Sequence, residues 1–368
     1  MKKTYLFITD TDFKTGKLTG AHKRFLELVR GIGEKNKIIL ISHRIPQLQD
    51  VQGITFYEIG DCKIHIPIHI KGMIELCKKL VAVKGELKYD YAISFGPSNT
   101  ICYSLCGYKN IVSLFREDAM EYLRAIGTPW FKIIYFRLQE YWAVRSSKKI
   151  IVQCENDKRN LIIRNHKWCH NIDKKIFIQI NNVNASWMNI QLISREKDVD
   201  SALKVLFIGD FSNERKGHGI LLPAISKLME EFDDIVLYVA GDGAQLEEYK
   251  KKYKKYSKII FLGRVNDIRK YLSLCDFEIV PSLVDSCPNT VLEGINAEIA
   301  VYGSNTGGIP DLLMKQEYLF EPKEEAIYSF LKNIYLQKRY IIDREKQKEL
   351  KKILTFDWSK KIQDLIEE

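Results

Sequence analysis

The sequence predicts an α/β protein built from two doubly wound domains, each with a parallel sheet covered by helices. Short apolar runs alternate with longer amphipathic stretches, which is the pattern of buried parallel strands and the helices that connect them. The alternation stops in a polar, asparagine-rich stretch over residues 181–200 and then starts again. A chain of 368 residues also has about the length of two domains.

In the first half, the apolar runs are predicted to be strands of one parallel sheet. Residues 21–33 are predicted to form a helix, because their apolar side chains recur at helical spacing. The residues expected to face inward from this helix are Phe25, Leu28, Val29 and Ile32. The predicted strands are Tyr5–Ile8, Lys37–Ser42, Tyr91–Phe95, Ile111–Phe115 and Lys149–Gln153.

The second half repeats the pattern with a new set of strands. A helix is predicted over residues 217–232, and its inward residues are Leu221, Leu222, Ile225 and Leu228. The predicted strands are Lys204–Gly209, Ile235–Ala240, Lys258–Leu262, Phe277–Pro281 and Ala300–Gly303. We therefore expect one domain over residues 1–185 and another over 200–350. Ligands of such sheets bind beyond the carboxyl ends of the strands, so the cleft between the domains is the expected site.

The composition is that of an ordinary soluble globular protein, with 46% hydrophobic and 28% charged residues. No apolar run approaches the roughly 18 residues of a membrane span. The apolar stretch at the amino terminus is short and ends in acids, which favours a first strand over a signal peptide. Eight cysteines are scattered without a paired framework, so we expect reduced thiols in a cytoplasmic protein.

Residues 120–175 carry most of the net charge of +10, with 12 Lys or Arg against 5 Asp or Glu. Aromatic residues are interspersed among these charges, notably between Trp130 and Trp142. This composition suits contact with an anionic membrane, where each Lys or Arg contributes about 1 kcal/mol. Two other interpretations are a core helix with a solvated basic face and a nucleic-acid-binding surface. No motif in the second half supports nucleic-acid binding.

Several residue groups have the form of metal sites but are better explained otherwise. Asp10 and Asp12 follow the first strand, where turn chemistry is the better interpretation. Three possible zinc ligands occur close together, but there is no fourth ligand nearby. They are His166, Cys169 and His170. Cys102 and Cys106 lie at helical spacing and are expected to be small core residues. We therefore expect no metal site.

Residues 281–312 contain the most informative stretch. Asp285 and Glu293 lie eight residues apart and flank an apparent helix start. Pro288 suits the first turn of that helix, and Asn289 and Thr290 suit capping. A helix start has free backbone N–H groups and a partial positive charge, so it binds anions such as phosphate. A carboxylate on either side fits a nucleotide diphosphate with sugar hydroxyls at both ends.

The second half resembles the retaining glycosyltransferases of family 4, which have the two-domain GT-B fold. The resemblance rests on seven short motifs in the order of the family, together with the carboxylate pair. These motifs are Phe207–Gly209, Arg215–Gly217, Val239–Gly243, Phe261–Gly263, Cys275–Asp276, Val280–Ser282 and Gly307–Asp311. The tail from Phe356 resembles the last helix of the family, which implies that residues 355–368 pack back on the first domain. The fold implied is GT-B, with two Rossmann-like domains facing a cleft.

The resemblance also implies roles for individual residues. Lys216 would neutralise the diphosphate of a nucleotide-sugar donor, Asp285 would hold the transferred sugar, and Glu293 would bind the ribose. The other residues expected on the donor side are Gly209, Arg215, Gly241, Gly263, Arg264, Asn289, Thr290 and Val291. Those expected on the acceptor side are Gly16, Gly20, Arg116, Glu117 and Asp118. No cofactor is implied beyond the donor itself.

The chain departs from the family pattern at several positions. Asp210 stands where the family usually has an arginine, which removes one cation from the diphosphate site. Arg215 could replace it, although on a regular element it would point away from its neighbour Lys216. Asp285 is one methylene shorter than the usual glutamate. The histidine that often follows a strand of the first domain is absent, and Arg116 stands in that region.

The expected function is transfer of a sugar, with retention of configuration, to a glycan or lipid-linked acceptor. The setting would be cell-surface polysaccharide synthesis at the cytoplasmic face of the membrane, with peripheral contact to anionic lipid. Asp210 and the absent histidine leave two alternatives open. One is a non-catalytic subunit that binds a nucleotide sugar, and the other is a GT-B-like epimerase of nucleotide sugars.

Overall fold

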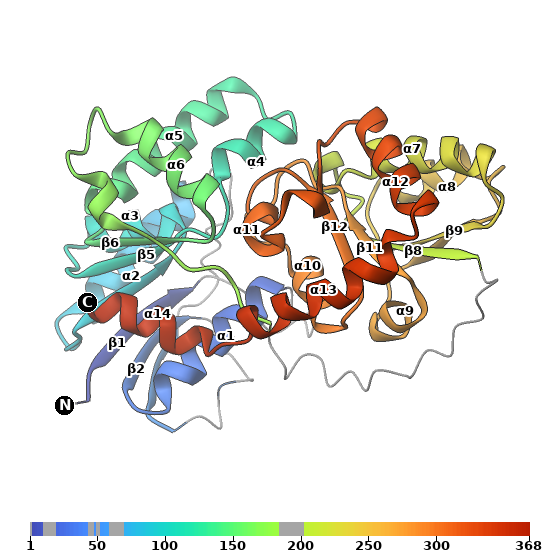
Figure 1. Cartoon of the computed structure of the whole chain (residues 1–368). Helices are drawn as coiled ribbons and strands as arrows, with labels where there is room; N and C mark the ends of the chain where they lie inside the picture. Colours follow the sequence, from blue (N-terminus) through green and yellow to red (C-terminus); the bar gives the residue numbers. More distant parts are fainter. Residues whose placement is uncertain (1, 10–19, 43–47, 49–51, 59–69, 184–201) are drawn as a thin grey trace. The chain divides into compact units, whose positions relative to one another are not determined.

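The computed structural model describes residues 2–9, 20–42, 48, 52–58, 70–183 and 202–368 (Figure 1). The chain divides into two compact units. The first unit comprises Met1–Met120, Thr128–Gln179 and Asp357–Glu368, and the second comprises Glu121–Gly127 and Ile180–Phe356. Within the part of the chain that the structure describes, no helix is long and apolar enough to cross a membrane.

The first unit contains a seven-stranded parallel sheet in the order β3-β2-β1-β4-β5-β6-β7. Its first six strands follow the order 3-2-1-4-5-6 of the Rossmann fold. The apolar runs form these strands because both faces of the sheet are covered by helices. The strands are β1 (Thr4–Thr9), β2 (Lys37–Ser42), β3 (Ile54–Glu58), β4 (Tyr91–Phe95), β5 (Ile111–Leu114), β6 (Lys149–Val152) and β7 (Ile176–Ile178).

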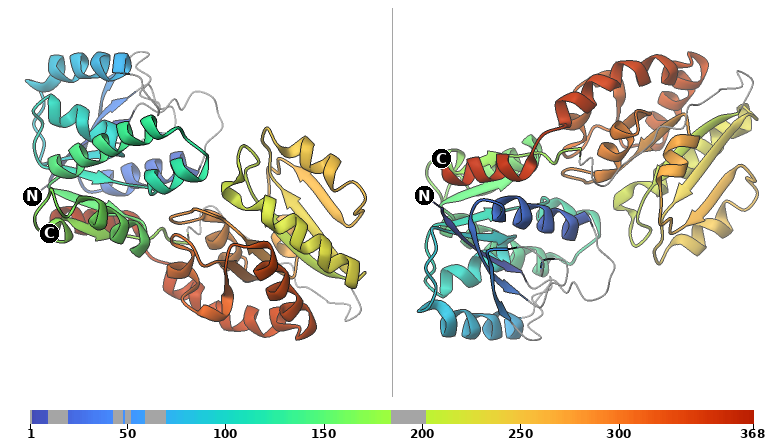
Figure 2. Two further views of the ribbon diagram at one scale, coloured as in Figure 1. Left: turned by 90° about the horizontal axis from the view of Figure 1, so that it is seen from above. Right: turned by 90° about the horizontal axis from the view of Figure 1, so that it is seen from below.

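The carboxyl-terminal helix belongs to the first unit and packs on its first helix (Figure 2). Gly31 permits the close approach, because a Cβ at this position would lie 2.0 Å from Ser359 Oγ. Lys3 Nζ donates to Glu367 Oε2 at 2.8 Å, which ties the end of the chain to its beginning. The helices are α1 (Gly20–Gly33), α2 (Ile70–Lys84), α3 (Pro97–Leu105), α5 (Trp130–Ser146), α6 (Glu155–Asn165) and α14 (Trp358–Glu367).

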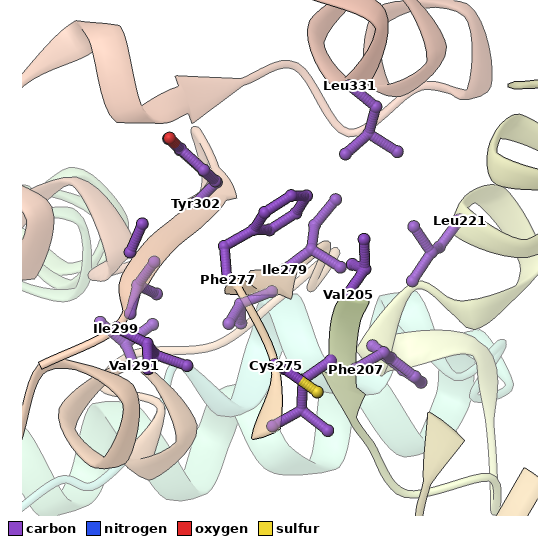
Figure 3. Packing of buried hydrophobic residues seen from close by; sticks show 14 of the residues in the cluster. Val205, Phe207, Leu221, Cys275, Phe277, Ile279, Val291, Ile299, Tyr302 and Leu331 are labelled. Atoms are coloured by element: carbon purple, nitrogen blue, oxygen red, sulfur yellow. The ribbon is translucent and has the colours of Figure 1, made fainter. Parts of the chain in front are cut away.

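The second unit repeats the same strand order in a six-stranded parallel sheet, β10-β9-β8-β11-β12-β13. Apolar residues from β8, β11, α7 and α12 fill its core (Figure 3). The strands are β8 (Leu203–Ile208), β9 (Ile235–Ala240), β10 (Ile259–Gly263), β11 (Phe277–Val280), β12 (Ala300–Ser304) and β13 (Leu319–Phe320). The helices are α7 (His218–Glu231), α8 (Leu246–Lys252), α9 (Arg269–Leu274), α10 (Asn289–Asn296), α11 (Ile309–Leu313), α12 (Glu324–Leu336) and α13 (Arg339–Leu354).

The predicted class of two doubly wound parallel sheets is confirmed, and most predicted strands agree with the structure to within one residue at each end. Three strands at or near sheet edges were not predicted. β3 is largely exposed, β7 has three residues and β13 has two, so none of them forms a long buried apolar run. The stretch predicted to join the domains lies mostly outside the described residues.

Candidate functional site

The predicted donor-side residues of the second unit follow the carboxyl ends of its strands. Gly209 follows β8, Gly241 follows β9, Gly263 ends β10 and Asp285 lies beyond β11. Because β8 lies between β9 and β11, the chain order reverses at this point of the sheet. Ligands of open α/β sheets bind at such a switch point. Lys216 also follows β8, whereas Asp285 follows β11. The two residues therefore come from strands on opposite sides of the switch point.

The two glycines nearest the switch point let neighbouring loops approach each other. A Cβ on Gly241 would lie 1.7 Å from the carbonyl oxygen of Gly209, so no larger residue fits there without movement. Gly241 N also donates to Gly263 O at 2.9 Å, and Gly209 N donates to Ala240 O at 3.0 Å. These glycines therefore set the shape of the sheet edge through their backbone.

Lys216 and Asp285 form an ion pair at this edge. Lys216 Nζ lies 2.5 Å from Asp285 Oδ2, and both side chains are largely buried. Lys216 ends a short 3₁₀ turn, η4 (Glu214–Lys216), which begins where Asn213 Oδ1 accepts from Arg215 N at 3.0 Å. The turn lies against Pro281, which directly follows β11. A Cβ at Gly217 would lie 1.9 Å from Pro281 O, and Gly217 has a φ of +75°.

Arg215 reaches the same carboxylate as Lys216. Its Nη1 lies 3.4 Å from Asp285 Oδ2 and 3.4 Å from Val284 O. The expectation that Arg215 points away from Lys216 is therefore wrong. It assumed a regular element, whereas both residues belong to a tight turn whose side chains converge. Two cations thus face one carboxylate.

The Gly307–Gly308 pair holds the backbone of Asp285 in place. Gly308 N donates to Asp285 O at 2.9 Å. Gly307 has a φ of +56°, and a Cβ there would lie 2.0 Å from the same carbonyl oxygen. Only glycine meets both conditions at this position. This contact gives a physical reason why Gly307 and Gly308 occur in the same chain as Asp285.

The start of α10 offers backbone N–H groups beside this ion pair. Asn289, Thr290 and Val291 form its first turn, where N–H groups have no acceptor within the helix. The predicted capping by Asn289 and Thr290 is wrong, since Pro288 is the N-cap residue and no side chain caps the helix. Asn289 Oδ1 and Thr290 Oγ1 are instead buried polar atoms that have no hydrogen-bond partner within the described part of the chain. The side chain of Val291 packs in the core.

Glu293 lies one turn further along α10 and is partly exposed. Close to it lies Glu278 of β11, which is fully buried. Its two carboxylate oxygens have no hydrogen-bond partner among the residues that the structure describes. Burial, followed by the charge of Glu293, raises the pKa of Glu278 well above its usual value, while Lys216 opposes the shift. Gly294 makes room for this carboxyl, because a Cβ there would lie 2.5 Å from Glu278 Oε2.

Glu278 was not singled out in the sequence, although a signal was present. It is an acidic residue within the apolar run from Phe277 to Pro281, for which the sequence predicts a strand. A carboxyl in such a run must be neutral or paired once the strand is buried. Only the structure shows that Glu278 lies against Gly294 of α10.

The carboxylate of Asp210 closes its own turn. Its Oδ1 accepts from Ser212 N at 2.9 Å and from Ser212 Oγ at 2.6 Å. Arg264 is exposed and directly follows Gly263, whose φ is +66°. The space around Gly263 is open, since no atom lies within 4 Å of a Cβ built there.

In the first unit, Arg116, Glu117 and Asp118 line a cavity of about 180 Å³ beyond β4, β5 and β6. Asp118 is buried, and its Oδ2 accepts from Arg164 Nη1 at 2.8 Å. The same guanidinium donates to Glu140 Oε2 at 2.8 Å. Burial opposes the positive charge of Arg164, but the hydrogen bonds that it donates to the two carboxylates raise its pKa overall. Asp118 is thus one member of a buried ionic network.

The remaining predicted positions are structural or lie outside the described residues. Gly20 begins α1, whereas Gly16, Asp10 and Asp12 are not described. Among the residues that are described, no cluster of three or more His, Cys, Asp or Glu side chains is arranged to hold a metal ion. Cys102 and Cys106 are buried, as expected for core residues.

The chain is similar in sequence to a family model and to several known proteins. The family model described as "Glycosyl transferases group 1" matches residues 202–335. Protein CapJ from Staphylococcus aureus is 30% identical over 172 residues, which are 45% of this chain and 43% of that protein. A phosphatidyl-myo-inositol mannosyltransferase from Mycobacterium leprae is 27% identical over 165 residues, 42% of this chain and 43% of that protein. The chain therefore matches less than half the length of these relatives.

Solved structures match over nearly the whole chain, at low identity. A glycosyltransferase from Rickettsia africae ESF-5 has a TM-score of 0.70 at 16% identity, over 99% of this chain and 98% of that one. HepE from Anabaena, solved in complex with UDP and glucose, has a TM-score of 0.70 at 13% identity, over 99% of both chains. Similarity at this level of identity concerns the fold alone.

The two sheets and the site at the edge of the second define an α/β protein with two Rossmann-like domains of the GT-B class. Residues 202–335 match the family of glycosyl transferases group 1. This is the family that the order of the short motifs and the carboxylate pair had indicated.

Proposed function

We propose that the chain is a retaining glycosyltransferase, which moves a sugar from a nucleotide-diphosphate donor to a glycan or lipid-linked acceptor. The observation that carries this proposal is the convergence of Lys216 and Arg215 on Asp285, next to the uncapped start of α10. Two cations and a helix start form an anion site, and carboxylates lie nearby to accept hydrogen bonds from sugar hydroxyls. No other described part of the second unit combines these groups.

In this proposal the donor diphosphate takes the place of Asp285 as the partner of the two cations. The charge that develops on the leaving diphosphate would then be stabilised by Lys216, Arg215 and the N–H groups of the first turn of α10. Asp285, once released, would accept from hydroxyls of the transferred sugar, and Glu293 would accept from the ribose. The protein supplies the cations in this mechanism, so we propose that no metal or additional cofactor is required.

The acceptor is proposed to be a glycan or a lipid-linked molecule of cell-surface polysaccharide synthesis. The name of one relative supports a lipid-linked acceptor, because that relative is a phosphatidyl-myo-inositol mannosyltransferase. The proposed setting is the inner face of the cytoplasmic membrane, with peripheral contact to anionic lipid. The exposed aromatic residues Trp130 and Trp142 of α5 support contact with an interface.

One observation favours a second candidate, a subunit that binds a nucleotide sugar without turning it over. Asp210 closes its own turn and stands where the family has a cation, so the diphosphate site has fewer charges. A nucleotide-sugar epimerase is a further alternative. It would convert the donor in the absence of any acceptor.

The test is to incubate the protein with nucleotide sugars and to measure release of the nucleoside diphosphate with and without acceptor glycans. Lys216→Ala and Glu293→Ala are expected to lose turnover at least tenfold. Lys227→Ala serves as a matched control, since Lys227 pairs with Glu325 on the exposed surface of the same unit. Turnover that is unchanged in both site variants would refute the proposed site, and donor binding without turnover would favour the second candidate.

A further inference from the structure

The first unit exposes apolar side chains along one face of α5. They recur every four residues, so they form a single stripe along the helix. At the middle of the stripe, Leu138 keeps 62% of its surface exposed. The opposite face of α5 is buried in the unit, so this helix is apolar on both faces. The alternative of a core helix with a solvated basic face therefore does not describe the exposed face of α5, which is apolar. The stripe consists of Trp130, Ile134, Leu138 and Trp142.

A groove of about 610 Å³ adjoins this stripe. Its volume lies in the range of small-molecule sites. Residues of α2 and α3 line it together with Tyr135 of α5. Among the described lining residues, Lys78 is the one that carries a charge. Val81 and Leu105 at its sides are 59% and 58% exposed. The other main lining residues are Met73, Ile74 and Cys77.

The stripe and the groove form one continuous surface, here called the α2–α3–α5 surface. Trp142 Nε1 donates to Ser104 Oγ at 3.4 Å, and Ser104 precedes the groove residue Leu105. On the other side, Gln139 of α5 contacts Met73 of α2. The helices α2, α3 and α5 therefore present their apolar side chains together.

The charges around this surface select its partner. α2 carries four lysines and one glutamate, and α3 has no charged residue. The single acid of α5, Glu140, is buried and paired with Arg164, whereas Arg145 is exposed. An apolar surface with a basic rim complements a bilayer with anionic headgroups. A two-fold contact between copies would bring the same basic rims together, which like-charge repulsion disfavours.

We propose that the α2–α3–α5 surface docks on an anionic phospholipid bilayer and that the groove accepts one hydrocarbon chain of a lipid. Lys78 at the groove pairs with the phosphate of that lipid, and Trp130 and Trp142 lie at the level of the headgroups. This inference rests on the proposed function, because it names the surface through which the enzyme would meet its membrane. The inference assigns the membrane contact to α2 and α3 as well as to α5, which lies in the basic segment of residues 120–175.

The test uses the full chain with vesicles of phosphatidylcholine alone and of phosphatidylcholine with phosphatidylglycerol. Leu105→Glu and Leu138→Glu change the groove and the stripe. Ile342→Glu is the matched control, since Ile342 is 57% exposed on α13 of the second unit. We expect each site variant to weaken binding to anionic vesicles at least tenfold and the control to bind like wild type. Lys78→Glu is expected to reduce the preference for anionic vesicles.

Two further measurements separate this inference from the proposed function. Part of the binding to anionic vesicles should survive at about 1 M salt. At this concentration the Debye length is roughly 3 Å, so attraction between exposed charges is largely screened. Tryptophan fluorescence should be quenched by lipids with brominated chains. Equal binding of Leu105→Glu and Ile342→Glu, or complete loss of wild-type binding in high salt, would overturn the inference. UDP affinity measured in the same samples would show whether the proposed donor site holds independently of membrane binding. A thermal unfolding midpoint equal to that of wild type would show that the variants are folded.

Discussion

Lys216 Nζ lies 2.5 Å from Asp285 Oδ2, and this ion pair occupies the position where we propose that the donor diphosphate binds. The carboxylate and a phosphate would compete for the same cations. The structure therefore represents a site whose cations are already neutralised by one of its own residues. Donor binding has to exchange that internal partner for an external one.

This competition predicts that Asp285→Asn binds UDP more tightly than wild type does. The substitution keeps the size of the side chain but removes the negative charge that Lys216 and Arg215 now face. We expect a several-fold gain in UDP affinity together with a loss of sugar transfer, because the hydroxyls of the transferred sugar lose the carboxylate that accepts their hydrogen bonds. Calorimetric titration with UDP and a transfer assay measure the two effects. Weaker UDP binding by Asp285→Asn would contradict the exchange.

The buried carboxyl of Glu278 predicts a pH dependence of stability. Its pKa is raised above the usual 4.5, mainly by burial, so the folded state binds more protons than the unfolded state above that pH. Its contribution therefore lowers stability as the pH rises from about 4.5, until the pH passes the raised pKa. Glu278→Gln removes this contribution and should raise the Tm at pH 7 by several degrees.

Thermal unfolding between pH 4 and pH 8 provides the measurement for Glu278→Gln. The gain should shrink toward pH 4, where the wild-type carboxyl is protonated in both states. Glu325→Gln serves as the control, because Glu325 is exposed on the surface of the same unit. A gain in Tm that is equal at every pH would contradict a raised pKa of Glu278.

Gly307 is predicted to be intolerant of any side chain. Gly307→Ala would place a Cβ 2.0 Å from Asp285 O and would also hold alanine at a φ of +56°. The backbone strain alone costs about 1–3 kcal/mol, and the clash would move Asp285 away from Lys216. Gly85→Ala is the control, because nothing lies within 4 Å of a Cβ there. Comparable stability and UDP affinity of both variants would show that the glycine is not needed.

Arg164 is predicted to be a stability determinant of the first unit. Arg164→Met leaves the buried carboxylates of Asp118 and Glu140 without their shared partner. Loss of one partner of a buried ion pair costs about 3–5 kcal/mol. Chemical denaturation should show this loss, whereas Arg159→Met on the exposed face of the same helix should change little. A near-wild-type unfolding midpoint for Arg164→Met would contradict the role of the network.

The sequence predicted the sheets well because strands such as Lys37–Ser42 and Tyr91–Phe95 are continuous apolar runs that must be buried. It did not predict β3, whose exposed edge position leaves no such run. The pairing of Arg215 with Asp285 could not be foreseen, because side-chain direction depends on a 3₁₀ turn that periodicity does not reveal. Likewise, Asn289 and Thr290 have residue types that suit capping, but Pro288 is the N-cap residue instead.

The most direct test of the central claim is a calorimetric titration of UDP into wild type, Lys216→Ala and Lys227→Ala. Hydrogen bonds to charged groups contribute about 1.5–3 kcal/mol, so Lys216→Ala should bind UDP at least tenfold more weakly than wild type. Lys227→Ala should bind UDP with the affinity of wild type. Equal affinity of all three proteins, or no binding of UDP and other nucleoside diphosphates by wild type, would contradict the account.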